Sequence, residues 1–547
     1  MANRARRLAT WSAAVAALVV LYVGAAALGD TRAYSGSDAG GKAATVKVMA
    51  ERGDWDPDVG YWAESADPEG RLHPLVKTTP IADRWVQAAS LPLVFASVPL
   101  WNAAGPPGLL VLPMAGAVLA AVAARRLART LGAGTGWSAF FLVGAASPAA
   151  FYALDFWEHA PAVGLVLLAM SLLLPGPGHG VSRLAAVGGG VAAGAAVAVR
   201  AEMAVYLAVF AVSVMVVGDC RRSWLRRPFS ILATTTAAAG VLVLNQLWER
   251  AVLGAGIQTS RVGSQASSIG SSLGDRARDA AITSVGLFAD DSRFALVLGA
   301  VAVASVVALG AVAVRGRVTL WRPAVVVAGS VVGLRMVAGL GFVPGSLVTA
   351  PLGGAALAAP AGPRMRVLVA TAVGSLPLVW AVQWTGDLLP QWGGRYTLAT
   401  GALLAVVGSV ALERAGWRRP AAVALVALSV VVAGYGLAWH VERTNYYGSV
   451  AARMSQEPAD VVVISTANHL GREVGTSYGE HRWLRANTDD ELELAADIVD
   501  RFDVARVDVL RIEGQSVPEL TDHRVEWSER FERSGPDIVL TRYQRVS

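Results

Sequence analysis

The sequence predicts a mainly α-helical, polytopic membrane protein of about 13 transmembrane helices, followed by a small extracytoplasmic α/β domain. Hydrophobic residues make up 54% of the 547-residue chain and charged residues 16%, against about 25% charged residues in an ordinary globular protein. Apolar runs of 16 or more residues recur along most of the chain, and about 20 such residues span a bilayer. This composition excludes a soluble enzyme, a disordered chain and a nucleic-acid-binding protein.

The first predicted span runs from Leu8 to Leu28 and follows three arginines. A cleavable signal peptide begins in the same way, but the run has full spanning length, which favours an uncleaved anchor. The other predicted spans cover residues 103–124, 132–153, 159–174, 184–199, 203–218, 228–247, 294–314, 323–341, 343–362, 367–382, 397–412 and 420–439.

The topology depends on residues 85–101, which are apolar enough to resemble another crossing. If they do not cross, the N-terminus and the arginine-rich connections all lie on the cytoplasmic side, as the positive-inside rule requires. We therefore predict a surface-lying or re-entrant helix there, a cytoplasmic N-terminus and a C-terminus outside the cell membrane. The connecting arginines on the cytoplasmic side are Arg125, Arg126, Arg129, Arg183, Arg221, Arg222, Arg226, Arg227, Arg315, Arg317, Arg322, Arg364, Arg366, Arg414, Arg418 and Arg419.

The predicted membrane domain covers residues 1–439, with a first outer loop over 30–102 and a second over 249–293. The formal net charge of +6 hides a segregation of charge, because residues 440–547 carry 20 acidic and 13 basic side chains. This tail forms the predicted α/β domain. Its strands are expected at 461–465, 506–512, 524–531 and 537–543, and a helix capped by Thr488 is expected between the first two.

Asp38, shortly after the first span, has two open interpretations. It can cap a helix that starts at Ala39, with Lys42 close enough to pair with it. It can also be a general base that accepts a proton from an acceptor hydroxyl as that hydroxyl attacks an activated sugar. The two are compatible, because a cap would hold the carboxylate in place.

A second cluster, Asp155, Glu158 and His159, lies at the outer junction of the third and fourth spans. Charge is common at a membrane surface, but three ionisable groups within five residues are costly there unless they are paired or functional. A Glu–His pair can tune a base or bind a metal. No further ligand has suitable spacing, so no metal site is predicted, and a requirement for a divalent metal ion is left open.

Three arginines are expected at similar depth in the outer half of the membrane. Arg200 lies at the turn between two short spans, Arg335 lies in the outer half of the ninth span, and Arg395 opens the twelfth. One such arginine would extend to the interface, whereas three suggest a bound anion, because guanidinium matches phosphate in bidentate geometry. The phosphate of a lipid entering from the outer leaflet would fit.

With these features the chain resembles the GT-C superfamily of integral-membrane glycosyltransferases, which use polyprenyl-phosphate-linked sugars on the outer face of the membrane. The resemblance covers residues 8–440. Many members carry an acidic pair in the first loop, whereas Asp38 is flanked by Ser37 and Ala39. The matching features, in chain order, are Asp38, Leu72-His73-Pro74, Ser147-Pro148 through Tyr152, Phe156-Trp157-Glu158, Arg200-Ala-Glu202 and Gly394-Arg395-Tyr396.

The resemblance implies that Asp38 is the catalytic base and that Arg395 contacts the lipid phosphate. The expected partners are a polyprenyl-phosphate-linked sugar, the lipid bilayer and a cell-envelope glycan, lipid or protein acceptor. Two alternatives stay open: a transporter or flippase of a lipid-linked substrate, for which we find no internal repeat, and a non-catalytic envelope assembly protein. The further residues expected to bind or orient substrate are Arg200, Arg335, Tyr396, Asp155, Lys42, His73, Glu158 and His159.

Overall fold

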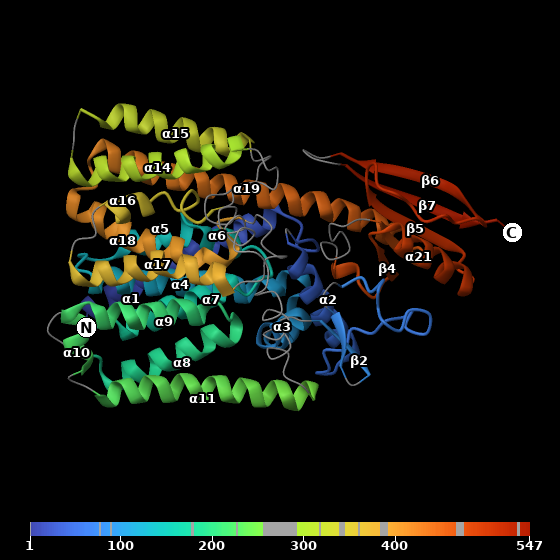
Figure 1. Ribbon diagram of the computed structural model, residues 1–547, viewed down its shortest axis with the longest axis horizontal. Helices are drawn as coiled ribbons and strands as arrows, with labels where there is room; N and C mark the ends of the chain where they lie inside the picture. The colour runs from blue at the N-terminus through green and yellow to red at the C-terminus, as the bar shows by residue number, and fades with distance from the viewer. Residues whose placement is uncertain are drawn as a thin grey trace.

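The structure, a computed structural model, consists of a helix bundle with a mixed β-sheet at one end (Figure 1). We call that end of the bundle the sheet end. The N-terminus and α10 lie at the opposite end. The residues described are 2–34, 36–75, 78–81, 83–87, 90–176, 180–225, 228–254, 293–316, 319–338, 345–358, 362–382, 392–465, 475–532 and 537–546.

The helices of the bundle are largely apolar, as predicted. Their bounds are α1 (Ala2–Leu28), α2 (Ser37–Arg52), α3 (Leu91–Ala104), η1 (Pro106–Leu110), α4 (Val111–Thr130), α5 (Trp137–Ala145), α6 (Pro148–Tyr152), α7 (His159–Leu173), α8 (Arg183–Val199), α9 (Met203–Val216), α10 (Gly218–Leu225), α11 (Pro228–Leu253), α14 (Arg293–Arg315), α15 (Trp321–Ala338), α16 (Gly353–Ala358), α17 (Pro363–Val382), η4 (Arg395–Thr397), α18 (Leu398–Ala415) and α19 (Pro420–Gln456).

Within the described ranges, seven helical stretches are long and apolar enough to cross a membrane, judged by length and composition, and five apolar helices are shorter. The chain is therefore described as a multi-pass membrane protein, and the count of thirteen spans stays a prediction. The single helix predicted over 132–153 is wrong. Ser147 is extended and caps α6, and Pro148 has no N–H to continue the ladder of α5. The predicted span at 343–362 contains the six-residue α16, and residues 343–344 and 359–361 lie outside the described residues.

In the segment 85–101, predicted not to cross, residues 85–87 end a hairpin strand and residues 91–101 belong to α3. The 14 residues of α3 extend only about 21 Å, less than the roughly 30 Å of a bilayer core. The hairpin pairs β1 (Thr78–Ile81) with β2 (Arg84–Gln87). Most of the second outer loop, residues 255–292, lies outside the described part of the chain.

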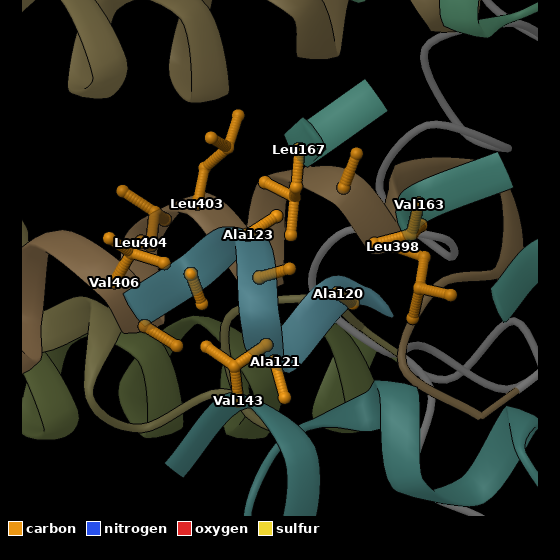
Figure 2. Close-up of a cluster of buried hydrophobic side chains, with 14 of the residues drawn as sticks. Ala120, Ala121, Ala123, Val143, Val163, Leu167, Leu398, Leu403, Leu404 and Val406 are labelled. Atoms are coloured by element: carbon orange, nitrogen blue, oxygen red, sulfur yellow. The ribbon is translucent and has the colours of Figure 1, made fainter. Parts of the chain in front are cut away.

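α18 lies at the centre of the bundle. Its most apolar stretch is 94% buried, whereas that of the peripheral α11 is 6% buried. Small and branched side chains from α4, α5 and α7 pack around α18, and Figure 2 shows Ala121, Val143 and Leu167 in this cluster with Leu398 and Leu404 of α18. This packing fixes the start of α18 and the short η4 turn directly before it, which begins with Arg395.

The C-terminal sheet has the strand order β4-β3-β5-β7-β6. β3 pairs in parallel with β4 and β5, and β7 pairs antiparallel with β5 and β6. Apolar side chains alternate along β3, so Val463 faces α21 (Asp489–Arg501) and Val462 faces α19. The strand bounds are β3 (Val461–Ser465), β4 (Arg482–Ala486), β5 (Arg506–Ile512), β6 (His523–Phe531) and β7 (Ile538–Arg545).

The predicted cap of α21 is present, because Thr488 accepts a hydrogen bond from the backbone N–H of Glu491. β4 was not predicted. The first loop joins this edge of the sheet: Trp62 donates to the carbonyl of Trp483, and the N–H of Arg485 donates to the carbonyl of Leu72. The sheet is thus attached to both α19 and the first loop.

Candidate active site

The candidate site is a set of buried charges at the sheet end of the bundle, where α2, the start of α7, the α8–α9 turn and the start of α18 meet. We call the following six residues the charged cluster; they comprise three cations and three carboxylates. They are Asp38, Lys42, Glu158, Arg200, Glu202 and Arg395.

Asp38 and Arg395, the base and the phosphate-binding residue that the resemblance implies, form an ion pair. Arg395 Nη2 lies 2.6 Å from Asp38 Oδ2, although the residues are 357 positions apart. The side chain of Arg395 is 8% exposed and that of Asp38 is 21% exposed. Tyr396 continues the contact, since its hydroxyl lies 3.0 Å from the same guanidinium nitrogen.

The helix-cap interpretation of Asp38 is wrong. α2 begins at Ser37 with Gly36 as its extended N-cap, and no side-chain cap is formed. Asp38 and Lys42 lie one turn apart on α2, but they take different partners. Lys42 forms a salt bridge with Glu158, 116 positions away, while Asp38 turns to Arg395.

Glu158 is shared by two cations. One carboxylate oxygen binds Lys42, and the other lies 2.8 Å from Arg200 Nη1. Arg200 also lies 2.7 Å from Glu202 through its Nε. Glu158 is placed by a tight turn, in which the N–H of Phe156 donates to Asp155 Oδ1. Asp155 is buried and so shapes the segment that carries Glu158.

Trp157 is the aromatic centre of the site. Arg395 lies over its ring at 4.7 Å, Lys42 Nζ is 5.9 Å from its centroid, and the ring of His159 packs against it at 4.7 Å. Gly36 covers the indole so closely that a Cβ there would lie 2.1 Å from a ring carbon. Trp157 belongs to the motif Phe156-Trp157-Glu158, but nothing in the sequence alone distinguishes it as a site residue.

Several buried polar atoms around Trp157 have no hydrogen-bond partner among the described residues. They are the Nε of Arg395, the Nε1 of Trp157, both ring nitrogens of His159 and the hydroxyl of Tyr34. Buried polar groups are nearly always satisfied. These groups are candidates to bond a polar ligand, and all four side chains can donate a hydrogen bond to an anion.

Two of the three predicted arginines converge. Arg200 and Arg395 both lie against the ring of Tyr396, at 5.2 and 4.8 Å from its centroid. Arg335 belongs to α15, but its side chain lies outside the described residues.

His73 lies in the core of the first loop and not in the charged cluster. Its ring stacks on Trp85 at 5.2 Å, its Nδ1 accepts from the N–H of Leu75, and its Nε2 lies 3.3 Å from the carbonyl oxygen of Gly60. Burial lowers the pKa of His73 to about 4. The ring is therefore neutral at physiological pH.

The described residues contain no group of three His, Cys, Asp or Glu side chains placed to hold a metal ion. In the charged cluster each carboxylate faces an arginine or lysine. A divalent cation would have to displace these partners, so the cluster does not fit a resident metal, and no step is assigned to one.

No protein-family model matches the chain, and neither does any curated protein. Among solved structures, the chain is similar to ArnT from Cupriavidus metallidurans bound to undecaprenyl phosphate, with 12% identity over 96% of this chain and 97% of that chain and a TM-score of 0.49. It is also similar to the oligosaccharyltransferase AglB from Archaeoglobus fulgidus in complex with an inhibitory peptide and a dolichol-phosphate, with 14% identity over 91% and 69% of the two chains and a TM-score of 0.41.

At such identities and TM-scores, the chemistry of this chain has to be inferred from its own residues.

Proposed function

We propose that the chain is a membrane glycosyltransferase that transfers a sugar from a polyprenyl-phosphate donor to an acceptor hydroxyl of the cell envelope. The observation that carries this proposal is the partly buried contact between Asp38 and Arg395. The contact joins a carboxylate that can act as a base to a guanidinium that can bind phosphate. It lies at the sheet end of the bundle, just before the central helix α18.

The donor phosphate binds at Arg395, with Arg200 beside it on the ring of Tyr396. The unpartnered N–H groups of Arg395 and Trp157 supply further donors to its oxygens. In binding, the phosphate competes with Asp38 for the guanidinium. The carboxylate is thereby released toward the acceptor.

Asp38 then removes the proton of the acceptor hydroxyl as its oxygen attacks the anomeric carbon. The bond from that carbon to the phosphate oxygen breaks, and its electron pair leaves with the polyprenyl phosphate. The leaving group gains one negative charge, which Arg395 and Arg200 stabilise in a site shielded from water. Attack opposite the leaving group inverts the anomeric configuration.

We further propose that the sheet end of the bundle lies outside the cell membrane and that the N-terminus is cytoplasmic. Figure 1 supports this topology, because the N-terminus and α10 lie together at the far end from the sheet. α10 carries Arg221 and Arg222, and basic residues favour the cytoplasmic side.

The proposal is tested with Asp38→Asn in purified protein supplied with a panel of polyprenyl-phosphate sugars. We expect transfer or donor hydrolysis to fall about 10²–10⁴-fold, the usual contribution of a general base. Asp54→Asn is the matched control, since Asp54 lies just beyond the end of the same helix, α2, and pairs with Arg52 at the surface. Unchanged turnover in Asp38→Asn would remove Asp38 from the mechanism. Movement of a lipid-linked sugar across vesicles without transfer would favour a transporter.

A further inference from the structure

A polar cavity lies beside α2, separate from the charged cluster. Its volume is about 270 Å³, near the lower end of the roughly 300–1,000 Å³ typical of small-ligand sites. Four parts of the chain meet around it, contributing Lys47 of α2, Trp101 of α3, Ser455 of α19 and Thr476 of η5 (Gly475–Ser477). None of these residues belongs to the site described above.

The cavity wall is fixed to the helix that carries Asp38. η5 approaches α2 so closely that a Cβ on Gly475 would lie 2.0 Å from the carbonyl oxygen of Gly40. Lys47 Nζ donates to the carbonyl of Thr476 and to Glu480, both at 2.7 Å. Movement of the wall and of α2 is therefore coupled.

The lining suits a neutral, hydroxyl-rich ligand. Arg32 is paired with Asp30, and Lys47 is paired with Glu51 and Glu480, so both cations of the lining are neutralised and do not favour an anionic ligand. Lys47 is buried, but the side chains of Arg32 and Glu51 are 53% and 55% exposed and can bond a ligand. Sugar hydroxyls donate to carboxylates and accept from guanidinium groups, and an indole such as that of Trp101 packs against the C–H face of a sugar ring.

We propose that this cavity binds a neutral saccharide portion of the acceptor; the proposal rests on the glycosyltransferase function proposed above. Lys47 follows Asp38 by nine residues, which is about 14 Å along a helix. A saccharide held in the cavity therefore contacts the same helix that carries Asp38.

The test measures binding of a panel of neutral di- and trisaccharides of hexoses and pentoses to the purified full chain by calorimetry. We expect at least one to bind, and Trp101→Ala to weaken it at least tenfold. Glu51→Gln, which changes an exposed side chain without altering the packing, should also weaken binding. The matched control is Trp55→Ala, because Trp55 is exposed and stacks on Phe95 away from the cavity.

Donor hydrolysis by the same proteins separates this proposal from the proposed function. Trp101→Ala and Glu51→Gln should hydrolyse the polyprenyl-phosphate sugar normally while losing transfer, and Asp38→Asn should bind the saccharide normally while losing hydrolysis. Binding that neither cavity variant weakens, or no binding of any neutral saccharide, would overturn the cavity assignment. Cavity-dependent binding in a wild-type protein that never turns over a donor would instead refute the glycosyltransferase function and the acceptor role with it.

Discussion

Replacing Glu158 with glutamine tests whether the charged cluster is a balanced unit. Its carboxylate is 5% exposed and lies between Lys42 and Arg200, which are 4% and 9% exposed. Removing one member of a buried ion pair costs about 3–5 kcal/mol, because the other charge is left uncompensated. Arg200 keeps Glu202 at 2.7 Å, while Lys42 keeps the ring of Trp157 at 5.9 Å. Most of the loss should therefore come from Lys42.

A double-mutant cycle with Lys42→Met measures this coupling, using denaturant unfolding in detergent followed by tryptophan fluorescence. Glu158→Gln alone should lower the free energy of unfolding by about 3–5 kcal/mol. Adding Lys42→Met should recover about 1–3 kcal/mol, because no unpaired ammonium then stays buried. As control, Glu529→Gln breaks a partly exposed pair with Arg453 and should cost less than about 1 kcal/mol. Wild-type stability in Glu158→Gln, or strictly additive costs, would refute the reasoning.

Three further outcomes follow from the geometry. Gly36→Ala should reduce sugar transfer at least tenfold, because the new methyl group displaces Trp157. Gly24→Ala is the control, because its new methyl group meets nothing within 4 Å and transfer should not change. Equal activities of the two variants would contradict the close contact between Gly36 and Trp157. Burial lowers the pKa of His73 to about 4, below about 6.5 in an unfolded chain. The contribution of neutral His73 to the free energy of unfolding is thus complete above about pH 6.5, and up to about 3 kcal/mol of stability is lost as the pH falls toward 4. His73→Phe should flatten this part of the curve of stability against pH. Arg395→Lys should weaken polyprenyl-phosphate binding about tenfold or more by removing the bidentate fork, and undiminished affinity in a lipid-binding assay would exclude Arg395 from the phosphate site.

The proximity of Asp38 and Arg395 could be inferred from sequence because a membrane restricts where the ends of spans lie. Once topology is assigned from charge, residues at the outer ends share one narrow layer. The partner of Lys42 could not be inferred in this way. Helical spacing shows that it shares a face with Asp38, but which face of α2 meets Glu158 depends on packing between distant segments.

Other differences have equally local causes. Nothing in the sequence distinguishes a buried His73 stacked on Trp85 from one that faces substrate. β4 could not be predicted from the sequence, because Arg482 and Arg485 interrupt its apolar pattern. The strand is defined by its pairing with β3. Pro148 was visible in sequence, yet an apolar run on both sides of it resembled one continuous helix.

α19 has a mechanical consequence for the whole molecule. It is one unbroken helix of 37 residues with its proline only at the start, about 55 Å long, and a bilayer core takes up only about 30 Å of that. The remaining length of α19 continues as a rigid helix, and the sheet packs against its C-terminal part. This helix therefore holds the sheet at a fixed distance from the part of α19 that has the length of a bilayer core.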